Sequence, residues 1–224
     1  MTLHLLQCSY VLQPHGEEHH HGSFVFLLLV SMLFGLYSVS SFSIKGKGKK
    51  WSNWKLCSFT TGCVLLAVAL SPSMFDYAHH DFSGHVLQHL VLGMFAPILL
   101  VLGAPVSLLL RTIPRRHSKS LAFMLNSGFF HILSHPFTAF VLNIGGMYAL
   151  YLTPLYNNLH NNPPLQIVVH LHFLAAGYLF IWSIIGPDPA PRRAKMVTRV
   201  FVMFLSIAAH ASLSKYMYAY SFPK

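Results

Sequence analysis

Long apolar stretches separated by short polar joins dominate the chain from residue 22 onward. A helix needs about 20 apolar residues to cross a hydrocarbon core of about 30 Å. Six stretches meet that length: Gly22–Ile44, Trp54–Phe75, Ser83–Leu110, Phe137–Tyr156, Leu165–Ile185 and Met196–Tyr218. We therefore predict an all-α fold, a polytopic membrane helix bundle of about six transmembrane helices.

Two stretches differ from a simple span. The third is the longest and contains Pro97 and Pro105, so we expect it to tilt, kink or project beyond the bilayer. Leu121–Leu133 is apolar but short, and we expect an interfacial or partly inserted helix there, with a seventh span as the alternative. The chain has no internal repeat or long linker. We therefore predict a His-rich extracytoplasmic tail, residues 1–21, followed by a single transmembrane helical domain, residues 22–224.

Composition supports this class. Of the residues, 54% are hydrophobic and 9% are charged, whereas soluble domains carry about 25% charged residues. A soluble enzyme with a solvated charged surface is thereby excluded, and 14% aromatic residues exclude a disordered chain. The three cysteines form no CxxC pair, so we expect neither a disulfide framework nor a thiolate metal site.

The placement of the cations predicts the orientation. The formal net charge is +10, and 13 of the 15 Lys and Arg residues lie in the joins after spans one, three and five. The positive-inside rule makes these joins cytoplasmic, so both termini face outward. We therefore predict a multi-pass protein of a cell membrane, namely the bacterial plasma membrane. Its basic charge is explained by topology and contact with the lipid bilayer, and no nucleic acid partner is needed.

Histidines gather on the outer side of this topology, where 13 of the 16 are placed. Three predicted spans contribute histidines at similar depth, namely His85, His89, His170, His172 and His210. Because a helix rises about 1.5 Å per residue, these positions fall in one layer less than about 10 Å thick. Ionisable groups inside a membrane are costly, so such a layer indicates function.

Helical spacing refines this set. Asp81, His85 and His89 are spaced four apart and share a face if the helix begins early enough, so Asp81 could ligate a metal or orient His85. His170 and His172 are about 200° apart on a helix, so only one of them faces the shared cavity. We interpret the methionines of these spans as packing residues. The candidate metal ligands are His85, His89, His170, His172, His210 and Asp81.

Imidazole suits copper, zinc, iron and nickel, and thioethers favour Cu(I). An outward-facing histidine site with methionines nearby suits copper best, with Cu(I) and Cu(II) both open. A bis-His haem is the alternative, because histidines on facing helices can supply both axial ligands.

Several stretches are distinctive when taken together: His85–Leu90 (HVLQHL), Ala96–Pro105 (APILLVLGAP), His135-Pro136, His170–Phe180 (HLHFLAAGYLF), Gly186–Pro191 (GPDPAP) and His210. Over roughly residues 55–218 the chain resembles the cytochrome c oxidase assembly factor CtaG family. One departure is Gln166, which stands where many members carry a further histidine.

The resemblance implies a non-enzymatic membrane protein that supplies copper to the catalytic copper centre of a haem-copper oxidase. Its partners would be a cytochrome c oxidase subunit in the membrane and a soluble copper donor. We interpret the loop from Gly186 to Pro191 as structural, because its prolines and Asp188 are typical of a turn.

Three other functions compete with this one. A membrane di-iron oxygenase would need about eight cytoplasmic histidines and bridging carboxylates, whereas three histidines are assigned there and no span contains an acid. A haem-binding or electron-transfer protein would show a Soret band. A copper transporter would need ligands that continue inward, where polar groups are few.

Overall fold

The computed structural model describes residues 15–220 apart from 47, 49, 160–161 and 190–192. Within these ranges the secondary structure is helical, with no strand. The elements in chain order are α1 (His15–Gly46), α2 (Asn53–Ala69), α3 (Pro72–His80), α4 (Phe82–Leu90), the π-helical segment η1 (Val91–Phe95), α5 (Ala96–Leu102), α6 (Pro105–Thr112), α7 (Arg115–Leu125), α8 (Gly128–Leu133), α9 (Pro136–Leu152), α10 (Leu155–Leu159), α11 (Pro163–Ile184) and α12 (Met196–Ala219).

All six predicted stretches contain helices, and the all-α prediction is confirmed for the described residues. Four helices are long and apolar enough to cross a membrane: Ser23–Gly46, Phe82–Leu102, Pro164–Ile184 and Met196–Ala219. The bent pair α2 and α3 makes a fifth if it is counted as one span, and α9 is a shorter apolar helix. The count of six therefore stays a prediction.

The first described helix overlaps the end of the predicted tail. Its first 14 residues lie outside the described chain, while α1 already begins at His15. The division into tail and membrane domain remains a prediction.

The second predicted span bends because of Pro72. Ser71, directly before the proline, is extended and cannot continue α2. Its hydroxyl then accepts a hydrogen bond from the Met74 amide at 3.3 Å and caps α3. The two helices meet at 56°, so the part of this span after Ser71 turns away from the axis of α2.

The third predicted span is interrupted twice, as its prolines indicated. Pro97 has no N–H to bond the Gly93 carbonyl, and the ladder widens into the π-helical η1, where the Ala96 amide bonds the Val91 carbonyl. At Ala104 the backbone enters the left-handed region with φ of 52°, and Pro105 starts α6 in a new direction.

A buried carboxylate holds this second break in place. Asp188, from the loop after α11, accepts hydrogen bonds from the Val106 amide at 3.1 Å and the Ser107 amide at 2.7 Å. These are donors that the first turn of α6 leaves unpaired, and the methyl side chain of Ala104 cannot accept a hydrogen bond from them. Arg193 donates to the carbonyls of Gly186 and Asp188 and fixes the loop itself. The loop after α11 therefore has the expected structural role, because its Asp188 caps the start of α6.

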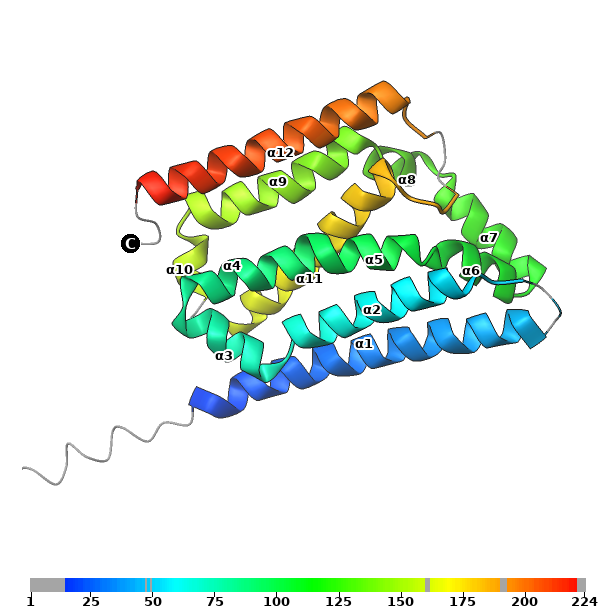
Figure 1. Ribbon diagram of the computed structural model, residues 1–224, viewed down its shortest axis with the longest axis horizontal. Coiled ribbons are helices and arrows are strands. Elements are labelled where there is room, and N and C mark those ends of the chain that lie inside the picture. Colours follow the sequence, from blue (N-terminus) through cyan, green and yellow to red (C-terminus); the bar gives the residue numbers. More distant parts are fainter. Residues whose placement is uncertain (1–14, 47, 49, 160–161, 190–192, 221–224) are drawn as a thin grey trace, which may run out of the picture.

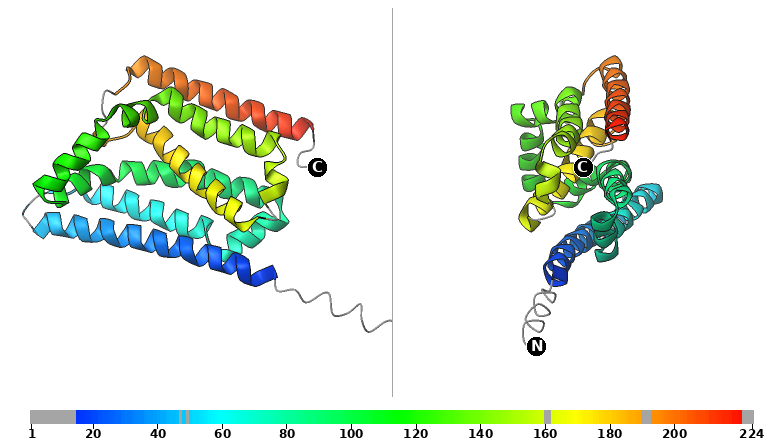
Figure 2. Two further views of the ribbon diagram at one scale, coloured as in Figure 1. Left: turned by 180° about the vertical axis from the view of Figure 1, so that it is seen from behind. Right: turned by 90° about the vertical axis from the view of Figure 1, so that its left-hand side faces the viewer.

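The helices are arranged in two groups with α11 between them (Figures 1 and 2). One group contains α1, α2 and the α4–η1–α5 helix, and the other contains α9 and α12. α11 runs obliquely and packs against α9, η1, α5 and α12. The start of α1 and the end of α12 lie at the same end of the bundle, and α6 and α7 lie at the opposite end (Figure 1).

The segment Leu121–Leu133 forms parts of two short helices, α7 and α8, joined at a turn. They contain 11 and 6 residues, too few for a span. The alternative of a seventh span is therefore not supported, and an interfacial placement stays a prediction.

Candidate metal site and adjoining cavity

His85 and His89 form a buried pair on one face of α4. They are one helical turn apart, and their ring centroids are separated by 4.4 Å. Their side chains are 4% and 7% exposed. The rings of Tyr151 and Tyr156 lie nearly perpendicular to that of His85, with centroids 6.0 and 4.9 Å away.

His170 on α11 completes a cluster of three imidazoles, which we call the His85–His89–His170 cluster. Its ring stacks on that of His89, with centroids 5.6 Å apart and planes 12° from parallel. The side chain is 2% exposed. The sequence prediction that histidines of separate spans lie at one depth thus holds for these three residues.

Both ring nitrogens of His170 face hydrogen-bond acceptors. Its Nδ1 lies 2.7 Å from the Gln166 carbonyl oxygen, which can only accept, and this shorter contact favours a hydrogen on Nδ1. Its Nε2 lies 3.2 Å from Oε1 of Gln88. The amide Nε2 of Gln88 donates to the Ala69 carbonyl at 2.8 Å, which fixes the amide orientation. In a neutral His170 ring, two acceptors would therefore face each other.

This arrangement favours a positive species between His170 Nε2 and Gln88 Oε1. A second proton would satisfy both atoms, but it would place a charge on an almost fully buried ring. A bound cation would satisfy the same two lone pairs. The chemistry of this contact therefore fits a metal ion held by His170 Nε2.

His89 also has unused ligating capacity. Neither of its ring nitrogens has a hydrogen-bond partner among the residues that the structure describes. Leaving such a buried polar group unpaired costs about 1–3 kcal/mol. Phe173 packs against the ring with centroids 4.5 Å apart, so water has little access from that side. Both ring nitrogens of His89 are therefore available to bind a ligand such as a metal ion.

The other candidate ligands lie elsewhere. His172 turns toward α9, where its Nε2 donates to the Leu142 carbonyl at 3.1 Å, and it packs on Gly146. The two-residue spacing thus separates His170 from His172, as expected. His210 on α12 bonds the Ser206 carbonyl of its own helix through Nδ1 at 3.0 Å.

Asp81 does not share the face of His85 and His89. α4 begins at Phe82, and Asp81 is extended with φ of −136°. Its carboxylate accepts from the Ser83 amide at 2.9 Å and caps α4. The early helix start on which its proposed role depended does not occur, and Asp81 belongs to the turn between α3 and α4.

The cluster is not a ready-made coordination sphere. Across the described residues, no group of three or more His, Cys, Asp or Glu side chains is positioned to hold a metal ion. The rings of His85, His89 and His170 pack edge to face or stacked. Metal binding would require these side chains to turn their nitrogens toward a common point.

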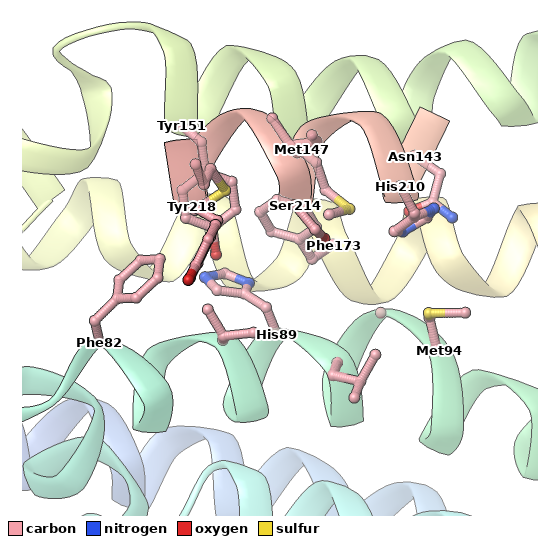
Figure 3. Close-up of a pocket in the computed structure, with 15 residues that line it drawn as sticks. Phe82, His89, Met94, Asn143, Met147, Tyr151, Phe173, His210, Ser214 and Tyr218 are labelled. Carbon is pink, nitrogen blue, oxygen red and sulfur yellow. The ribbon is translucent and has the colours of Figure 1, made fainter. Parts of the chain in front are cut away.

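A cavity of about 550 Å³ opens beside His89, between α4 and η1 on one side and α9 and α12 on the other (Figure 3). Three methionines line it, Met94, Met147 and Met217. His210 also lines it and is separated from His89 along its length (Figure 3). The sequence interpretation of the methionines as packing residues did not anticipate this shared cavity.

Gln88 is the residue of the site that sequence reasoning missed. It is 1% exposed and bridges the end of α2 to His170. A polar residue between two histidines in an apolar helix was the available signal. Its role could not be read from α4 alone, because both of its partners lie on other helices.

Comparison with known proteins decides the family. The family model of the cytochrome c oxidase caa3 assembly factor (Caa3_CtaG) matches residues 35–223, which include all five candidate histidines. The chain belongs to the CtaG family. The resemblance seen in the sequence is thereby confirmed, and association with cytochrome c oxidase assembly follows at the level of the family.

Similar curated proteins add no named activity. This CtaG-family chain is 35% identical over 192 residues to an uncharacterized protein of Mycobacterium leprae, covering 81% of the chain and 29% of the relative. It is 36% identical over 182 residues to an uncharacterized protein of Mycobacterium bovis, covering 78% of the chain and 28% of the relative. The chain thus spans less than a third of the length of these relatives. No solved structure matches it.

Proposed function

We propose that this CtaG-family protein binds copper at the His85–His89–His170 cluster and supports metalation of the catalytic copper centre of cytochrome c oxidase. Family membership supports the assembly role. The observation that carries the copper proposal is the contact between His170 Nε2 and Gln88 Oε1, where two acceptors face each other unless a second ring proton or a bound cation lies between them.

The three histidines would have different parts in holding copper. His170 would ligate through Nε2, because Gln166 keeps its Nδ1 protonated and orients the ring. His89 would ligate through either ring nitrogen, since both are buried without a partner among the described residues. His85 lies against His89 and would complete the set.

The cavity beside His89 would give copper a way out of the cluster. Its thioethers are soft ligands that bind Cu(I) in preference to harder cations. Copper in the Cu(I) state could therefore move from His89 past Met94 and Met147, and His210 offers a further imidazole. In this proposal His210 acts in transfer, whereas its depth in the sequence predicted a ligand of the binding site.

The proposed direction of transfer follows the predicted topology. Copper would arrive from a soluble donor on the outer side of the bacterial plasma membrane. It would leave toward an oxidase subunit that lies alongside in the bilayer. The role is that of a carrier, and no catalytic step is assigned to the chain.

Copper content of the oxidase tests this function. In a strain that lacks the gene, we expect the oxidase to contain its haem but little copper in the catalytic centre. The wild-type gene and a His172→Gln variant should restore the copper, because His172 faces α9. A His170→Gln variant should not. Normal copper in the oxidase of the deletion strain would overturn the proposal.

A further inference from the structure

A second hollow lies at the opposite end of the bundle from the start of α1. It has a volume of about 730 Å³, and its described lining residues are Lys45, Gly48, Lys50, Trp51, Ser52, Asn53, Lys55 and Arg111. Four of them are cations and none is an acid. We call this hollow the basic pocket.

Trp51 forms a rigid wall of the basic pocket. The side chain is 6% exposed, and its indole N–H donates to the Tyr37 hydroxyl at 3.4 Å. That hydroxyl donates to the Gly103 carbonyl at 2.7 Å. Tyr37 in turn stacks on Phe59 with ring centroids 3.8 Å apart. The indole is therefore held in place by α1, α2 and the end of α5.

Two cations share this one ring. Lys55 Nζ lies 4.8 Å and Arg111 Cζ lies 5.7 Å from the Trp51 ring centroid. Cation–π attraction offsets part of their repulsion. Lys45 is held at the rim by a 2.8 Å hydrogen bond to Oδ1 of Asn53. Four like charges around one hollow favour an anion within it.

The surroundings indicate where that anion comes from. Phe42 is 64% exposed and lies three residues before Lys45 on α1, and Leu109 is 45% exposed two residues before Arg111. Trp54, 70% exposed, stands at the same end of the bundle, as interfacial tryptophans do. The exposed apolar side chains suit the acyl chains of a phospholipid, and the cationic hollow beside them suits its anionic headgroup.

We infer that the basic pocket binds the phosphodiester headgroup of an anionic phospholipid on the cytoplasmic side of the membrane. Lys55 and Arg111 would hold the phosphate against Trp51, and Lys45 and Lys50 would neutralise further charge. The acyl chains would lie along Phe42 and Leu109. The site is separate from the His85–His89–His170 cluster and does not depend on copper.

The test uses the purified full chain in a neutral detergent. Its melting temperature is followed while dioleoylphosphatidylglycerol, dioleoylphosphatidylcholine or inorganic phosphate is added. We expect a saturable rise with phosphatidylglycerol only. Each basic residue near a membrane surface contributes about fivefold in affinity. The double variant Lys55→Gln/Arg111→Gln should therefore need about 25-fold more phosphatidylglycerol for the same rise.

Arg115→Gln/Arg116→Gln is the matched control, because it removes two cations that do not line the pocket. It should respond as the wild type does. If both double variants bind phosphatidylglycerol equally weakly, the lipid responds to diffuse surface charge and not to this pocket. If inorganic phosphate raises the melting temperature as much as phosphatidylglycerol does, the ligand is a free phosphate. Either result overturns the inference. If the first double variant does not fold, the single variant Lys45→Gln replaces it, because this change leaves both cation contacts with Trp51 in place. It should need about fivefold more phosphatidylglycerol. No change in the required amount would contradict the inference.

Discussion

Gly177 allows α11 to lie directly on the backbone of η1. A Cβ added at this position would collide with the carbonyl oxygen of Gly93. That carbonyl faces outward from η1 because Pro97 has no N–H to bond it. Small residues permit such close approach between membrane helices. This contact sets the distance between α11 and α4, and thereby brings His170 against His89.

Gly177→Ala is expected to lower the free energy of unfolding by about 1–3 kcal/mol, because the new methyl group overpacks the contact with Gly93. Thermal unfolding in detergent measures the effect. Gly145→Ala on α9 is the control, since its nearest neighbour would be Val141 Cγ1 at 3.9 Å. A similar loss in both variants would show that the close approach is not the cause.

The residues of the site differ in how far the sequence could predict them. His85 and His89 were predictable as a pair, because four-residue spacing fixes their shared face on any helix. The choice between His170 and His172 needed the rotation of α11, which is set by packing at Gly177 and not by local spacing. His210 was assigned to the cluster from its depth, yet depth does not define the direction in which a side chain points.

At the scale of helices, prolines decide where the predicted spans break. Pro72, Pro97 and Pro105 each mark an interruption in the structure. The sequence could locate these breaks, but not their form. The π-helical turn at η1 and the left-handed Ala104 depend on contacts with α11 and Asp188, which are distant in the chain.

Asp188→Asn is expected to destabilise the protein by roughly 1.5–3 kcal/mol. Each donor bonds a different carboxylate oxygen, and Asn keeps only one of these oxygens, so one of the two part-buried N–H groups loses its acceptor and the other loses a charged one. Unfolding in detergent should show the loss. Asp76→Asn removes the charge of an exposed acid and should be nearly neutral. If Asp188→Asn is as stable as Asp76→Asn, the capping of α6 is not a stabilising contact.

For the whole molecule, the predicted orientation follows from the basic joins. The start of α1 and the end of α12 lie at the same end of the bundle, opposite α6 and α7 (Figure 1). The geometry thus agrees with an even number of crossings. The distribution of Lys and Arg predicts that the end with α6 and α7 faces the cytoplasm.

Single-cysteine labelling tests the orientation in a chain whose native cysteines are replaced by serine. A membrane-impermeant maleimide should label Lys215→Cys, near the end of α12, in intact cells. Lys119→Cys on α7 should react only after the membrane is made permeable. The reverse pattern would invert the topology and place the His85–His89–His170 cluster near the cytoplasmic side.

The copper content of the purified full chain tests the central claim most directly. We expect the wild type to bind copper and His170→Gln to lose at least tenfold of its copper content. His172→Gln makes the same substitution on the other side of α11 and should keep the wild-type copper content. The wild type should show no Soret band. Equal copper in all three proteins, equal loss in both variants, or a Soret band in the wild type would contradict a copper site built on His170.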